Sequence, residues 1–258
     1  MKRIFVGSGC IRPLLSLGAL VGWLLAGSVP AQVPAGTGAS FDAALMRLFD
    51  AHKSFTAEAE LRVMDAQKQD KVLLPMQFAA RDGRFRTEVD LSRMKGSQAR
   101  PEQMGMVKQM GMDRIISITR PDTGKMHMVF PSARAAVNLA LPAEERDAMQ
   151  KPPQLERKVL GEEKVDNHPC RKEQVTLTTP GGRKTEVTVW LATDLKDFPI
   201  QIQTTEGGDT VIVRYRNVQF REPAAELFEP PADYTAYSSM EAFTAGLMQK
   251  LMKEAGQR

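Results

Sequence analysis

Apolar and polar residues alternate in three successive runs between residues 183 and 219. The apolar positions of these runs lie in Val187–Leu191, Ile200–Ile202 and Val211–Tyr215. A period of two is typical of a strand with one buried and one exposed face. Gly207-Gly208 separates the last two runs and indicates a hairpin, because glycine adopts positive φ at little cost. We therefore predict three antiparallel strands whose apolar face another part of the chain must cover.

The same alternation recurs along most of the chain before residue 183. It predicts strands at residues 55–63, 72–80, 85–89, 114–119, 125–130, 134–139, 156–165 and 170–179. Helices are predicted at 41–52 and 238–254 from the spacing of apolar residues, and at 143–149 after Pro142. The predicted fold class is mainly β with α. It is a half-open β-barrel, one curved antiparallel sheet of about 10–11 strands, with helices on the concave face.

The first 31 residues have the composition of a secretory signal peptide. Lys2, Arg3 and Arg12 are the basic residues around the start of the apolar run Leu14–Ala26. The alternative is a membrane anchor, but the apolar run is shorter than the roughly 18 to 20 residues that a span needs. We therefore predict export, with cleavage after Ala31.

The remaining chain divides into one domain and two flanking segments. We predict a flexible linker at 32–40, the half-barrel domain at 41–237 and a C-terminal amphipathic helix at 238–258.

The chain has 35 basic and 31 acidic residues, a net charge of +4. The leader carries three of the basic residues and no acidic one, so a net charge of +1 remains after its removal. This balance argues against nucleic acid as a partner.

Candidate catalytic and metal-binding residues are few. No two of His52, His127 and His168 have the helical spacing of metal ligands, and the common catalytic motifs are absent from the sequence. His168 and Cys170 share a strand face, but a nucleophilic pair also needs an orienting group and an oxyanion donor. We predict a protein that is not an enzyme, with no metal and no cofactor. Cys170 is interpreted as a buried apolar residue, the alternative being a disulfide between chains.

The candidate site is an apolar cavity on the concave face of the sheet. Ten residues alternate with polar neighbours and should point together into this cavity, because a single strand register buries them on one side. They are Leu61, Val63, Leu74, Met76, Phe78, Val187, Val189, Ile202, Val211 and Val213.

A methionine-rich segment at 92–113 interrupts the strand pattern. It contains five methionines and several glycines, and we predict a mobile loop with a short helix. Methionine adapts to irregular apolar ligands. We expect this loop to form a gate over the cavity, with Met104, Met106 and Met110 touching the ligand. The alternatives are a disordered linker and a segment of the core.

The sequence combines the predicted leader, the predicted helix at 41–52 and the strand at 55–63 with the later segments Val165–Cys170, Val189–Leu191, Asp197–Ile200 and Leu227–Tyr234. Over most of the chain after the leader, this pattern resembles the LolA/LolB-like superfamily of periplasmic lipoprotein-sorting carriers, in an uncharacterised branch, which implies a periplasmic location. The resemblance also implies a half-open barrel, lidded by helices, that holds the acyl chains of lipids or lipoproteins without catalytic residues. A membrane or periplasmic protein partner is also compatible with this family. The alternative is an RseB-like sensing or protein-interaction module without a transported ligand.

Three structural features would separate these functions. A continuous apolar cavity between sheet and helices favours a carrier. An inner face sealed by large side chains, together with a free strand edge, favours a protein-interaction module. Convergent titratable residues with perturbed pKa values would favour an enzyme.

Overall fold

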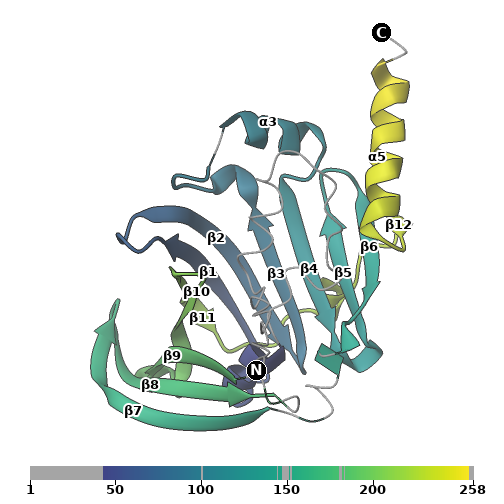
Figure 1. The fold of residues 1–258 in the computed structure, drawn as a ribbon. Helices are drawn as coiled ribbons and strands as arrows, with labels where there is room; N and C mark the ends of the chain where they lie inside the picture. The colour runs from purple at the N-terminus through teal and green to yellow at the C-terminus, as the bar shows by residue number, and fades with distance from the viewer. Residues whose placement is uncertain are drawn as a thin grey trace, which may run out of the picture.

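The computed structural model describes residues 43–99, 101–143, 145–146, 151, 153–179, 182 and 184–255. The predicted leader (1–31), linker (32–40) and most of the predicted helix at 143–149 lie outside these residues. The described chain forms one sheet of 12 strands, in the order β12-β6-β5-β4-β3-β2-β1-β11-β10-β9-β8-β7. Figure 1 shows that this sheet is strongly curved and that its two edge strands, β7 and β12, do not meet. The predicted half-open barrel is therefore confirmed.

The strands match the alternating segments closely. They are β1 Ser54–Met64, β2 Asp70–Arg81, β3 Arg84–Asp90, β4 Arg114–Arg120, β5 Lys125–Phe130, β6 Ala135–Ala140, β7 Gln154–Val165, β8 His168–Thr178, β9 Lys184–Ala192, β10 Phe198–Glu206, β11 Asp209–Gln219 and β12 Thr235–Tyr237. All neighbouring pairs are antiparallel except β12 and β6. The twelfth strand was not predicted, because three residues are too few to show an alternation.

Burial divides the central sheet into two faces. Along β1 the apolar residues, Leu61 and Val63 among them, are buried, whereas Glu58 and Arg62 are exposed. The register continues this division, since Leu61 lies opposite Leu74 of β2 and opposite Val213 of β11. We call the side that carries Leu61 the inner face and the other side the outer face.

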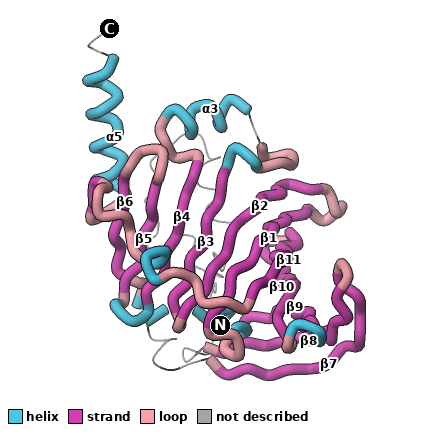
Figure 2. The backbone as a smooth tube through the Cα atoms, turned by 180° about the vertical axis from the view of Figure 1, so that it is seen from behind, coloured by secondary structure: helices cyan, strands magenta, loops and turns pink. Residues whose placement is uncertain are grey.

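Three helical segments pack at different places on the sheet (Figures 1 and 2). The helices are α2 Ala43–Met46, continued by the 3-10 turn η1 Arg47–Phe49, then α3 Pro101–Gln109 and α5 Met240–Ala255. The η1 residue Phe49 packs on the inner face. The end of α3 contacts the β5–β6 turn, where a Cβ at Gly111 would lie 2.9 Å from the Ala133 backbone nitrogen. The α5 residue Phe243 stacks on Phe130 of β5 with 4.5 Å between the rings.

A separate apolar cluster covers part of the outer face. The 3-10 turn η5, Ala225–Phe228, lies across strands β3 and β4 and buries Phe228 completely. This ring packs with Ala79, Ile118, Val129 and Ala136. The extended segment after β11 therefore covers part of the outer side of β2 to β6.

The outer face is also buried at the other end of the sheet, which the sequence did not predict. Trp190 and Gln201 alternate with the apolar residues of β9 and β10, and this alternation predicts an exposed polar face, yet both are buried. The Trp190 ring nitrogen donates to Glu163 of β7 at 3.0 Å, and Arg214 donates to Gln201 at 2.7 Å. Arg214 also donates to Asp166 in the β7–β8 turn at 3.2 Å. This turn therefore contacts β11 across two intervening strands, a contact that no local pattern encodes.

Tyr215 carries a polar atom that the core does not satisfy. Its side chain is fully buried among aromatic rings, and its hydroxyl has no hydrogen-bond partner among the residues that the structure describes. Burial raises the pKa of this phenol well above its ordinary value. Because an unsatisfied buried hydroxyl costs about 1–3 kcal/mol, Tyr215→Phe should raise the free energy of unfolding by about 1 kcal/mol.

Urea denaturation checks this expectation, with Tyr234→Phe as the matched control. Tyr234 is partly exposed on the other side of the sheet, so its change should stay within about 0.5 kcal/mol. A less stable Tyr215→Phe variant would show that the hydroxyl does have a partner.

Candidate functional site

All ten residues predicted to line the cavity are buried. Each of them belongs to one apolar cluster that extends over both halves of the sheet. The strand register places them side by side, with Ile202 opposite both Val189 and Val213, and Val63 opposite both Val72 and Val211. Their ability to bind a ligand remains a prediction.

Large aromatic side chains fill part of this inner face. Phe49 of η1 lies at the centre, with its ring 5.5 to 5.9 Å from those of Phe55, Phe78, Phe198 and Tyr215. All five residues are almost completely buried. One predicted cavity residue, Phe78, therefore packs within the protein's own aromatic core.

The rest of the inner cluster is rich in methionine. Met46, Met76, Met94, Met112 and Met128 are buried in it, and Met104, Met110 and Met240 pack against it while partly exposed. Methionine has three rotatable bonds and a polarizable sulfur, so it can repack around an irregular apolar object. A face of this composition can exchange internal contacts for contacts with a flexible ligand.

The methionine-rich segment at 92–113 is more ordered than a mobile loop. Backbone hydrogen bonds tie it to β2, because Lys95 exchanges two of them with Leu73 and Gln98 donates to Lys71. Val107 and Met112 are buried beside the helix end. The predicted short helix is α3. The prediction of a mobile loop did not include the backbone bonds to β2, because the sequence pattern could not show pairing with a distant strand.

Helix α3 ends in a tightly fitted glycine. Gly111 has φ +69°, and its N–H donates to the Lys108 carbonyl, while the Met112 N–H donates to the Val107 carbonyl. This hydrogen-bond pair closes the helix and brings the apolar side chains of Val107 and Met112 inward. Of the three predicted gate methionines, Met106 is 64% exposed, whereas Met104 and Met110 pack against the core.

The C-terminal helix leaves part of its apolar stripe uncovered. Phe243 and Leu247 are buried, but Met248 is exposed and Met252 is 72% exposed. Figures 1 and 2 show α5 extending beyond the sheet, at the same end of the molecule as α3. Exposed methionines of two helices therefore lie at one end of the half-barrel.

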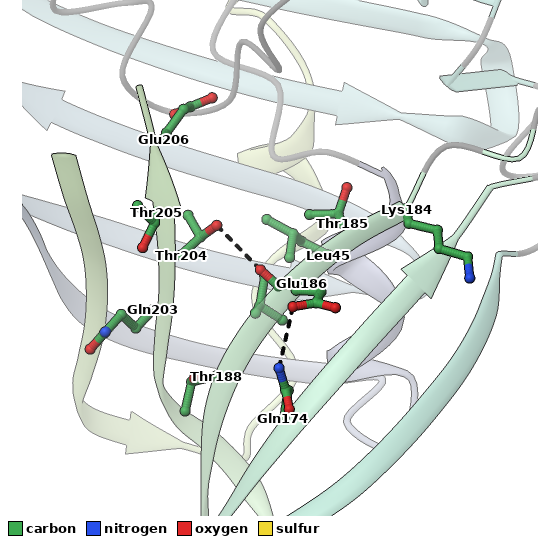
Figure 3. A pocket seen from close by; sticks show the side chains of 11 residues that line it. Leu45, Gln174, Lys184, Thr185, Glu186, Thr188, Gln203, Thr204, Thr205 and Glu206 are labelled. Carbon is green, nitrogen blue, oxygen red and sulfur yellow. Dashed lines mark hydrogen bonds between the residues drawn. The ribbon is translucent and has the colours of Figure 1, made fainter. Parts of the chain in front are cut away.

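A polar pocket lies between β9 and β10 (Figure 3). It has a volume of about 430 Å³ and is lined by Leu45, Gln174, Lys184, Thr185, Glu186, Val187, Thr188, Gln203, Thr204, Thr205 and Glu206. Val187 is the one member of the predicted site among these residues. The alternation of β9 and β10 could not indicate this pocket, because it depends on where the two strands separate.

His52, Cys170 and His168 each contact neighbouring residues of the fold. Burial lowers the pKa of His52, although a hydrogen bond with the Asp197 backbone acts in the opposite direction. Burial raises the pKa of the Cys170 thiol, which lies 3.4 Å from the His168 carbonyl oxygen. His168 itself bonds Asp194 at 2.8 Å. Within the part of the chain that the structure describes, no three His, Cys, Asp or Glu side chains are grouped as a metal site requires.

No helix in the described ranges combines the length and the apolar composition needed to cross a bilayer.

Comparison with known proteins gives matches among solved structures alone. No family model matches the chain, and no curated protein matches it. A LolA superfamily protein from Nitrosomonas europaea shares 10% identity over 69% of this chain and 90% of that chain, with a TM-score of 0.34. Lipoprotein LppX from Mycobacterium tuberculosis shares 11% identity over 70% and 93%, with a TM-score of 0.38. The MucA/MucB complex from Pseudomonas aeruginosa shares 15% identity over 77% and 64%, also with a TM-score of 0.38.

A LolA superfamily protein is therefore among the solved structures that the chain matches. Identities of 10 to 15% and TM-scores below 0.5 support no conclusion about ligand or partner. The function must therefore be argued from the geometry of this chain.

Proposed function

We propose that this chain is an exported binding protein that carries an acyl chain of a lipid or lipoprotein against the inner face of its half-barrel. The observation that carries the proposal is the methionine-rich apolar cluster on the inner face of an unclosed sheet. The cluster residues are buried against one another, so in this proposal the apolar cavity opens only as the ligand enters. In this proposal the leader is cleaved after Ala31, and residues 41–237 form the binding domain in the periplasm.

The proposed ligand lies along the predicted inner-face residues other than Phe78, beyond the part that Phe49 fills. Flexible methionine side chains move aside as the acyl chain enters, and its apolar surface replaces their mutual contacts. The segment at 92–113 is the proposed gate, with Met106 exposed at its surface and Met104 and Met110 facing the cluster. Binding of this kind requires no catalytic residue, metal or cofactor.

Binding of a fluorescent fatty acid to delipidated protein tests the proposal. Replacing Met104, Met106 and Met110 together with serine should weaken binding about a hundredfold, because three apolar contacts worth about 1 kcal/mol each are removed. Met106→Ser alone should leave the urea midpoint unchanged, since this side chain is largely exposed. Met248→Ser on α5 is the matched control and should change neither quantity.

Native mass spectrometry of protein purified from the periplasm gives a second measurement. A co-purified lipid is expected, and it should be lost from the triple variant. Absence of any lipid, together with no saturable binding of the fatty acid, would contradict the proposed function.

A specific observation favours a second function, the docking of an extended protein segment. Strand β7 is a 12-residue edge of the sheet, and its Val159 and Leu160 are 60% and 48% exposed. A long edge can accept another strand, although the irregularity of pairing between Val159 and Gly161 and the flanking charges oppose it. Val159→Lys with Leu160→Lys should abolish the capture of such a partner without changing the lipid that is retained.

A further inference from the structure

Strands β9 and β10 separate before either of them ends. Their pairing stops where Gln203 lies opposite Thr188. Beyond that point, residues 184–187 pair only with β8 and residues 204–206 only with β11. Two strand edges therefore face each other across a wedge inside the sheet, and the polar pocket of about 430 Å³ occupies this wedge (Figure 3).

The lining of the wedge includes residues of the apolar inner cluster as well as exposed polar residues. Side chains alternate along a strand, so Thr185 and Val187 point to the inner side, whereas Glu186 and Thr188 point to the outer side. Val187 is buried in the inner cluster, and Leu45 of α2 packs against the same cluster. Both residues also line the pocket. A molecule in the wedge could therefore extend an apolar part inward while its polar part stays between the strands.

The lining offers hydrogen-bonding groups and charges of both signs. Four threonine hydroxyls line it, and the Thr204 hydroxyl donates to the Glu186 carbonyl across the wedge at 3.4 Å. The Glu186 carboxylate accepts from Gln174 at 3.3 Å and is exposed at the opening. Glu186, Glu206 and Lys184 together give the lining a net charge of −1. This charge disfavours a purely anionic group and favours one that carries an ammonium.

We propose that the wedge between β9 and β10 binds the headgroup of the amphiphile whose acyl chain lies on the inner face, and that this headgroup is zwitterionic and bears an amine, as in an aminophospholipid. The inference rests on the proposed function. Glu186 faces the ammonium, the threonine hydroxyls bond the phosphate and ester oxygens, and Lys184 at the rim faces the phosphate. Leu45 and Val187 mark the passage of the acyl chain toward the core.

A competition between two phospholipids tests the headgroup site. Delipidated protein is exposed to vesicles containing equal amounts of phosphatidylethanolamine and phosphatidylglycerol with the same acyl chains, and the lipid that it retains is quantified by native mass spectrometry. The wild-type chain should prefer phosphatidylethanolamine. Glu186→Gln should reduce the ratio of the two lipids about two- to fivefold, the range expected for a partly exposed ion pair, while the total lipid retained stays the same.

Two controls separate a binding effect from a folding effect. Glu186 is exposed, so Glu186→Gln should leave the urea midpoint unchanged, and Glu186→Lys should reverse the preference. Glu156→Gln on the exposed edge strand makes the same chemical change outside the wedge and should leave the ratio as in the wild type. Retained lipid with the same ratio in the wild type and in both Glu186 variants would overturn the headgroup site alone. Failure to retain either lipid would contradict the proposed function itself.

Discussion

Replacing Phe49 with alanine is expected to lower the free energy of unfolding by about 3–5 kcal/mol, the range measured for buried Phe→Ala changes in cores. Phe49 is 2% exposed and touches four aromatic rings, two in near-parallel and two in edge-on arrangement. Removing its ring deletes these contacts at once and leaves a cavity that rigid strand residues cannot refill. The N-terminal helical segment would also lose its main attachment to the inner face.

Urea denaturation followed by circular dichroism measures this loss. Phe220→Ala is the matched control, because Phe220 is 38% exposed and lies at the edge of the same cluster, 5.9 Å from Phe198. Its replacement should cost less than about 1.5 kcal/mol. If Phe49→Ala costs no more than Phe220→Ala, the aromatic core is not centred on Phe49.

The strands could be predicted because each pattern depends on residues that are close in sequence. Residues 55–63 and 72–80 alternate in polarity, and they form β1 and β2 with one face buried. The turn at Gly207-Gly208 was equally local, since both residues adopt positive φ. The ten inner-face residues followed from the same alternation, because a fixed register places them on one side.

The features that were missed depend on contacts between distant segments. Trp190 is buried because the β7–β8 hairpin reaches across the outer face, which no alternation within β9 can indicate. The methionine-rich segment is ordered because it pairs with β2, at Leu73 and Lys95. Likewise, the wedge exists because, beyond Thr188, β9 pairs only with β8 and β10 only with β11. The polar residues that line it come from both faces of the sheet. Secondary-structure propensity and hydrophobic periodicity describe one strand at a time, so they do not show where two neighbouring strands separate.

Replacing Glu173 with glutamine is expected to lower the free energy of unfolding by about 1–3 kcal/mol at pH 7. Glu173 is 4% exposed, and its carboxylate accepts from Arg157 at 2.9 Å and from Arg171 at 2.8 Å. Removing one charge of a buried pair costs about 3–5 kcal/mol when both partners are buried. The two arginine side chains are more than one third exposed and can regain water, so we expect a smaller loss.

The dependence of stability on pH provides the sharper test of this network. Burial raises the pKa of Glu173, but the hydrogen bonds from Arg171 and Arg157 outweigh burial and hold the pKa below its ordinary value of 4.5. The unfolded chain therefore takes up this proton at a higher pH than the folded chain does. The stability from Glu173 is complete above pH 4.5 and is lost as the pH falls through the lower folded pKa.

Urea midpoints measured between pH 7 and pH 3 should show this difference directly. The wild-type chain should lose more stability on acidification than Glu173→Gln, so the two curves should approach each other below pH 4.5. Glu88, whose pKa is also lowered, is present in both proteins and cancels in the comparison. Glu162→Gln, an exposed change on β7, should follow the wild-type curve. If the curves of the wild type and Glu173→Gln run parallel, the ionised carboxylate of Glu173 gains no stability from the two arginines.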